Sequence, residues 1–120
     1  ILEFNIKTKT LVGPVIQNLW MPHSITKFQN TLAVLDSMTG RLLTLNKSIE
    51  LELPGFLRGL DFDDEFALIA VSSHRYPEKV KIKKYPVLMN ALLYLIDVKN
   101  NMTKTISISG TETIHSVIFK

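Results

Sequence analysis

Three short stretches of this sequence share one plan: His23-Ser24-Ile25-Thr26-Lys27-Phe28, Arg58-Gly59-Leu60-Asp61-Phe62 and His115-Ser116-Val117-Ile118-Phe119. Each begins with a basic or imidazole residue, continues with a tiny residue and an aliphatic one, and ends in phenylalanine. A plan that recurs along a chain is the sequence signature of a repeat architecture. These stretches therefore decide the fold class.

The spacing of the three stretches indicates the kind of repeat. Ile25 and Leu60 are 35 positions apart, and Leu60 and Val117 are 57 apart. The second interval contains an insertion at residues 74–90, and without those 17 residues it would be 40. Repeats of about 40 residues that each hold four short strands are typical of β-propellers.

The segments between the repeat starts are strands rather than helices. Residues 49–53 alternate between apolar and acidic side chains, as a half-buried strand does. Residues 37–40 form a hairpin loop with glycine where a positive φ is needed. No segment has a convincing helical pattern. We therefore expect an all-β fold, a partial β-propeller of about two and a half four-stranded antiparallel blades. The expected boundaries are the end of a preceding blade at 1–19, a first blade at 20–55, a second blade at 56–110 with the insertion at 74–90, and the start of a third blade at 111–120.

Composition narrows the classes of function. The chain has 120 residues, of which 46% are apolar and 21% are charged, a globular balance. Its net charge of +3 is too small to suggest nucleic acid, although it suits an anionic ligand. No apolar run approaches the roughly 20 residues of a membrane span. The absence of cysteine excludes a disulfide framework and fits a reducing compartment, so we expect a cytoplasmic protein.

Three motifs occur in a fixed order: residues 19–24, which contain Trp20-Met21-Pro22-His23-Ser24, then Leu35-Asp36-Ser37 with Thr39-Gly40, then Leu53-Pro54-Gly55-Phe56 with Arg58-Gly59-Leu60. In this respect the chain resembles an uncharacterised bacterial β-propeller family, a domain of unknown function with tryptophan-x-proline-histidine-serine and leucine-proline-glycine-phenylalanine signatures. The resemblance implies a propeller fold and no particular activity. It also implies an interior piece of a longer chain, whose partners are the remainder of its own propeller or further copies of itself.

The repeat starts are the candidate ligand site. The innermost strand of each propeller blade begins at one rim of the central channel, so His23, Arg58 and His115 would lie at equivalent rim positions. Arginine offers a bidentate fork and imidazole a donor, which suits a carboxylate, phosphate or sulfate. The small Ser24 would let a ligand approach the backbone, as would its counterparts Gly59 and Ser116. Trp20 would stack on a sugar ring. In the alternative interpretation, these side chains hydrogen-bond carbonyls of adjacent blades and Trp20 fills a gap between blades.

Two classes of function remain open. The first is a non-enzymatic binding or scaffold module with a small anionic or sugar-derived ligand at the rim. The second is a hydrolase or lyase that acts on a glycan-like substrate, which would need a base within hydrogen-bond reach of the ligand. We expect no metal and no cofactor, because hard cations prefer oxygen ligands and no repeat start carries a carboxylate.

The insertion carries a cluster of lysines. Lys79, Lys81 and Lys83 alternate with apolar residues, so an extended segment would present all three, together with Lys84, on or beside one face. The simpler interpretation is a solvated hairpin whose charges discourage edge pairing. The alternative is a surface for an anionic polymer or a membrane.

Overall fold

The computed structural model describes residues 1–74, 76–82 and 87–120. These residues form ten strands in antiparallel sheets, and one short helix. A separate hairpin comes first, made of β1 (Leu2–Asn5) and β2 (Thr10–Pro14). The first sheet contains β3 (Pro22–Phe28), β4 (Thr31–Asp36), β5 (Arg41–Thr44) and β6 (Glu50–Glu52). The second sheet contains β7 (Phe56–Phe62), β8 (Phe66–Ser72), β9 (Leu92–Asp97) and β10 (Met102–Ser107). The all-β prediction is thus confirmed.

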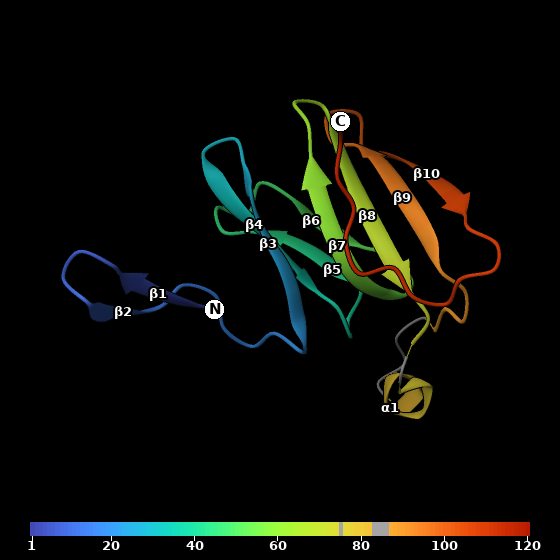
Figure 1. Cartoon of the computed structure of the whole chain (residues 1–120), viewed down its shortest axis with the longest axis horizontal. Helices are drawn as coiled ribbons and strands as arrows, with labels where there is room; N and C mark the ends of the chain where they lie inside the picture. The colour runs from blue at the N-terminus through green and yellow to red at the C-terminus, as the bar shows by residue number, and fades with distance from the viewer. Residues whose placement is uncertain (75, 83–86) are drawn as a thin grey trace.

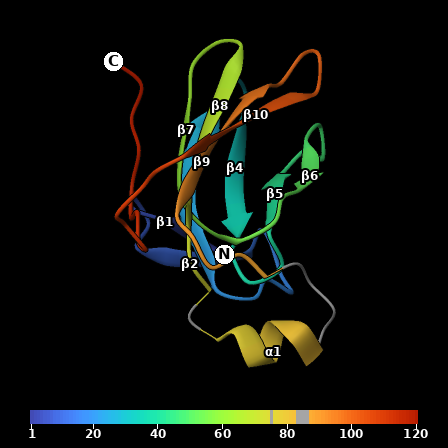
Figure 2. The same cartoon turned by 90° about the vertical axis from the view of Figure 1, so that its right-hand side faces the viewer.

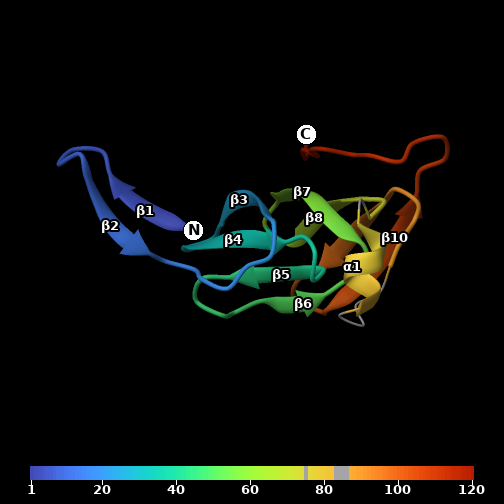
Figure 3. The same ribbon diagram turned by 90° about the horizontal axis from the view of Figure 1, so that it is seen from below.

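Each of the two larger sheets is a meander whose strand order follows the sequence, and every neighbouring pair is antiparallel. The two sheets lie beside each other, and the β1–β2 hairpin projects away from them (Figure 1). Strands β3 and β7 are edge strands of their sheets, and both lie in the upper part of the view from below (Figure 3). The first strands of the two meanders are therefore neighbours.

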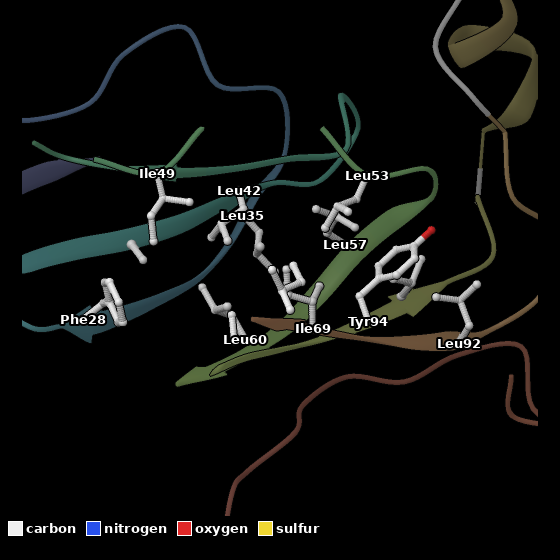
Figure 4. Close-up of a cluster of buried hydrophobic side chains, with 14 residues drawn as sticks. Phe28, Leu35, Leu42, Ile49, Leu53, Leu57, Leu60, Ile69, Leu92 and Tyr94 are labelled. Atoms are coloured by element: carbon white, nitrogen blue, oxygen red, sulfur yellow. The ribbon is translucent and has the colours of Figure 1, made fainter. Parts of the chain in front are cut away.

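The core fills the space between the two sheets (Figure 4). Strands β4 and β5 contribute Leu35 and Leu42, both fully buried, and β8 and β9 contribute Ile69 and Ile96 from the opposite side. Every second residue of β9 is buried, and β8 is buried along most of its length, so both strands direct an apolar face into this core. Packing of face against face is therefore what holds the sheets together.

Hydrogen bonds join β3 to β7 directly. The hydroxyl of Ser24 donates to the carbonyl of Arg58 at 2.6 Å, and that of Thr26 donates to the carbonyl of Leu60 at 3.3 Å. Both strands carry a register irregularity at this level, in β3 between His23 and Thr26 and in β7 within residues 57–59. A bulge re-aims the side chains beside it, so each strand begins with a local kink.

Residues 108–120 form no strand. They run beside β7 instead, visible in the red trace of Figure 1. The amide of Phe119 donates to the carboxylate of Asp61 at 2.7 Å. A Cβ on Gly59 would lie 2.8 Å from the Cα of Ser116, so only glycine allows this approach without a shift of the backbone. The expected third repeat start thus lies against the second sheet, although no ladder has formed there.

The insertion corrects one expectation. Residues 77–82 form a helix, α1 (Pro77–Ile82), at the bottom of the view in Figure 2. The extended segment with an all-lysine face is therefore wrong for Lys79 and Lys81. The ammonium of Lys79 lies 4.6 Å from the centroid of the Tyr76 ring. Pro77 suits the first helical position, and Glu78 follows in the first turn, where the helix dipole favours an acid. Lys83 and Lys84 lie outside the described residues.

Truncation of a core side chain should destabilise the protein far more than truncation of an exposed one. Leu35→Ala should lower the free energy of unfolding by about 2–5 kcal/mol, because it opens a cavity between the two sheets. Met102→Ala, which truncates a side chain that is 62% exposed on the outer strand, should change it by less than about 0.5 kcal/mol. Urea unfolding followed by circular dichroism measures both. Equal losses would show that the core does not lie between the sheets.

Candidate functional site

Phe56 lies at the centre of the predicted site, at the beginning of β7. It is 1% exposed and packs with Met38, while Trp20 lies against the same small cluster. The His23 ring meets it edge to face, with centroids 5.5 Å apart and an interplanar angle of 74°. The guanidinium carbon of Arg58 lies 6.0 Å from its centroid, at the limit of a cation–π contact. Phe56 therefore links three of the five residues expected in the site.

His23 comes from β3 and is oriented by two neighbours. Its Nδ1 lies 3.0 Å from the carbonyl oxygen of Met21 and 2.8 Å from the hydroxyl oxygen of Ser37. The carbonyl oxygen can only accept, so this contact is a hydrogen bond when Nδ1 carries a proton, whereas the Ser37 hydroxyl can pair with Nδ1 in either tautomer. In both tautomers these neighbours occupy Nδ1, and Nε2 is the nitrogen left to meet a ligand.

Arg58 and Ser24 face each other across the β3–β7 contact. Arg58 is half-buried, with its guanidinium next to Phe56, and its carbonyl accepts the hydroxyl hydrogen of Ser24. The backbone of Ser24 has a φ of 49°, which is uncommon for a residue other than glycine and marks the kink in β3. Ser24 thus does what the alternative interpretation expected, since its hydroxyl serves the contact between the sheets.

Trp20 is held by a buried carboxylate at the end of β4. Asp36, which is fully buried, accepts the Trp20 amide hydrogen at 2.6 Å through Oδ1. Its Oδ2 accepts from the Thr39 hydroxyl at 2.6 Å and from Arg41 Nη2 at 2.7 Å. Charge-assisted hydrogen bonds of this kind are about twice as strong as neutral ones. Asp36 therefore fixes the segment that leads into β3.

His74 completes the ring of side chains around Phe56, with centroids 6.2 Å apart, and sequence reasoning missed it. Its amide donates to the Leu88 carbonyl at 3.0 Å, and its Nδ1 accepts from the Leu88 amide at 3.1 Å. Burial lowers the pKa of His74, and the nearby Leu88 carbonyl opposes that shift because it can accept only from the protonated nitrogen. The neutral ring therefore ties together the two ends of the insertion.

His115 stands apart from the other expected residues. It is exposed on the segment beside β7, one position before Ser116, whose backbone lies against Gly59. The close approach of Ser116 explains the glycine at position 59. The space beside Gly59 is therefore taken by the chain itself, which corrects the expectation that a ligand approaches the backbone there.

The larger cavities lie away from this cluster. An open groove of about 430 Å³ runs between residues 15–19 and β5, and another of about 500 Å³ lies between residues 88–92 and 107–111. Among the described residues, no three His, Asp or Glu side chains lie close enough together to hold a metal ion. No helix formed by those residues is long and apolar enough to cross a membrane.

Comparison with known families adds one identification. Residues 4–119 match the family described as a domain of unknown function, DUF4915. The chain belongs to the DUF4915 family. No curated protein and no solved structure matches it. The resemblance expected from sequence is thus confirmed at the level of a family of unknown function, and the signature motifs stay predictions.

The structure of this DUF4915 chain shows which signals sequence analysis overlooked. Phe56 closes the leucine-proline-glycine-phenylalanine motif two positions before Arg58, which was the available clue that it would lie beside that side chain. His74 offered no comparable signal, because its importance depends on Leu88, fourteen positions later, and on the packing that brings the two together.

Asp36 should contribute more to stability than an exposed acid does. Asp36→Asn removes the charge that Arg41 and Thr39 bind, and should lower the free energy of unfolding by about 1–3 kcal/mol. Glu50→Gln is the control, because Glu50 is exposed at the edge of the first sheet. Urea midpoints measure both. If the two variants unfold at the same urea concentration, the buried carboxylate has no special role.

His74 makes stability depend on pH in one direction. Because its folded pKa lies below the unfolded value, which is about 6.5, its contribution is complete above pH 6.5 and is lost as the pH falls through the folded pKa. In His74→Asn the amide oxygen replaces Nδ1 as acceptor without titrating. Between pH 7 and pH 5 the free energy of unfolding should fall less in the variant than in the wild type. Above pH 7 the difference between the two free energies should stay constant. Parallel curves across the acidic range would contradict this assignment.

Proposed function

We propose that this protein is a binding module of β-propeller architecture, and that its ligand is a small anion held where β3 and β7 begin. One observation carries the proposal: His23 and Arg58, from neighbouring sheets, meet at the same buried ring of Phe56. The ring of Phe56 thus brings two side chains that can carry positive charge to the start of their strands. An arrangement of that kind favours a negatively charged ligand.

The contacts between successive units support the propeller. Thr26 of β3 bonds the backbone of the second sheet, and Asp61, 35 positions later, bonds the backbone of the terminal segment. Ser24 donates a hydrogen bond to the backbone of Arg58, and Gly59, again 35 positions later, lies close to the backbone of Ser116. Each unit thus meets the next through equivalent residues. We assign blades to 20–55 and 56–110, the end of a preceding blade to 1–19, and the start of another to 111–120.

The chemistry suits a carboxylate, phosphate or sulfate, including an acidic sugar derivative. The guanidinium of Arg58 offers a planar fork, and the His23 ring donates through Nε2 when that nitrogen carries the hydrogen. Both side chains are half-buried, and partial removal from water strengthens their attraction for an anion. His115 begins the next unit and would add a third side chain to His23 and Arg58. Trp20 packs against the cluster of Met38 and Phe56 and so supports the ring that these side chains contact.

Binding is favoured over hydrolysis or lysis of a glycan. Hydrolysis of a glycan normally uses two carboxyl side chains that a substrate can reach, so the Nε2 of His23 does not by itself supply that chemistry. Asp36 and Ser37, the polar side chains closest in the hydrogen-bond network to Trp20 and His23, are both fully buried and bonded within the protein. They support the architecture and are inaccessible to a substrate. The absence of cysteine fits a function in the cytoplasm.

Thermal unfolding with and without sulfate or phosphate tests the proposal. An anion at tenfold excess over its Kd stabilises the folded protein by about 1.4 kcal/mol, which corresponds to a Tm rise of several degrees. Arg58→Ala should abolish the rise. Lys27→Ala, which removes an exposed cation of the same strand pair, should keep it. Chloride at matched ionic strength controls for general salt effects. The proposal fails if wild type and Arg58→Ala respond equally to every anion.

A further inference from the structure

The two ring nitrogens of His23 have different surroundings. Its Nδ1 lies 3.0 Å from the Met21 carbonyl oxygen and 2.8 Å from the Ser37 hydroxyl oxygen. Met21 directly precedes β3, and Ser37 follows the end of β4, where it is fully buried. Both neighbours therefore face the same nitrogen, and Nε2 remains for a ligand.

The Met21 carbonyl favours a hydrogen on Nδ1. A carbonyl oxygen only accepts, so it gains a hydrogen bond when Nδ1 carries a proton and faces a lone pair when Nδ1 is bare. The Ser37 hydroxyl adapts to either state, because it can donate or accept. A neutral His23 ring that keeps its bond to Met21 thus has a bare Nε2, which repels an anion.

A second proton reverses the property of Nε2. In an imidazolium both nitrogens donate, so Nδ1 keeps its bond to the Met21 carbonyl while Nε2 donates to the ligand. The bond to the anion is then charge-assisted, which makes it about twice as strong as a neutral one. The protonated ring of His23 therefore suits both contacts, whereas each neutral tautomer gives up one of them.

Arg58 supplies a permanent positive charge on the neighbouring strand. Its guanidinium carbon lies 6.0 Å from the centroid of the Phe56 ring, and the centroid of the His23 ring lies 5.5 Å from the same point. An anion held by Arg58 at this place attracts a further positive charge. The anion and a proton on His23 therefore favour each other, and each raises the affinity for the other by the same factor.

Two further titratable groups lie near His23, on other elements. His74, which follows β8, contacts the same Phe56 ring with centroids 6.2 Å apart, and burial lowers its pKa and so favours the neutral ring. At the end of β4, the fully buried carboxylate of Asp36 forms an ion pair with Arg41 at 2.7 Å. The charge of Asp36 is thus already balanced, and His74 adds no permanent charge.

The remaining charged residues of β3 and β7 lie near the far ends of these strands. Lys27 is exposed near the end of β3. Asp61 lies near the end of β7, and its carboxylate accepts the amide hydrogen of Phe119 at 2.7 Å. The coupling between anion and proton therefore concerns His23 and Arg58, at the start of the two strands.

We propose that His23 takes up a proton when the anion binds, so that the protein holds its ligand more tightly as the pH falls. This inference rests on the proposed anion site and adds its regulation. Below neutral pH, the imidazolium and Arg58 hold the anion together. Above it, Nε2 is bare, Arg58 acts alone, and the ligand is released.

Calorimetric titration with sulfate tests the proposal on the unmodified protein, because sulfate keeps its charge over the range in which an imidazole titrates. The dissociation constant should rise by about tenfold from pH 6 to pH 8. At pH 7, heats measured in buffers of different ionisation enthalpy should show that protons are taken up, at most about one per anion. The proton count requires no variant, so it stands even if a substituted protein folds poorly.

The chain has three histidines, so single substitutions can assign the proton. His23→Gln puts a neutral amide in place of the ring, and its affinity for sulfate should be lower than that of the wild type at pH 6 and the same at pH 6 and pH 8. His74→Asn is the matched control, since His74 contacts the same Phe56 ring, and it should keep the dependence on pH. His115→Gln, at the exposed third histidine, should keep it as well.

The possible failures are distinguishable. Equal dissociation constants at pH 6 and pH 8, without proton uptake, would contradict the inference and leave the anion site standing. Retention of the pH dependence in His23→Gln would assign the proton to another group and refute the inference too. If wild type and Arg58→Ala bind sulfate equally, the anion site itself is wrong and its regulation falls with it.

Discussion

Two side-chain hydroxyls, those of Ser24 and Thr26, donate to carbonyls of the neighbouring strand β7. These bonds connect the first strands of two separate sheets, whose ladders are otherwise complete within each meander. They fix the distance and level at which the sheets meet, and the apolar faces of β4, β5, β8 and β9 close over the core as a result. The relative position of His23 and Arg58 follows, because these two residues belong to different sheets.

The site shows how a buried apolar ring can organise polar chemistry. The side chain of Phe56 cannot form a hydrogen bond, yet its ring contacts the side chains of His23, Arg58 and His74. Around it, the polar groups divide into two kinds. Asp36 and Ser37 are fully buried and bonded within the protein, whereas His23 and Arg58 are half-buried at the start of their strands. Buried and half-buried polar groups thus lie next to each other around one ring.

Periodic features were predictable from sequence, and contacts between distant segments were not. The alternation at 49–53 led to the correct all-β class, because it depends on a local pattern, while the repeat that begins at His23 and Arg58 stays a prediction. The helix α1 was missed because its lysines alternate as in a strand, while Pro77 and Glu78 favour a helix start. The role of Gly59 was misassigned, since the backbone of Ser116 that fills the adjacent space comes from 57 positions away.

The two hydrogen bonds between His74 and Leu88 have a consequence for how this family can diversify. They close the insertion at its base, so β8 and β9 keep their register whatever lies between the two residues. Once its ends are pinned, a surface loop can lengthen at little thermodynamic cost. Related chains are therefore free to exchange the segment that contains α1 for one of different length or charge, and to acquire new surface properties while the sheets stay unchanged.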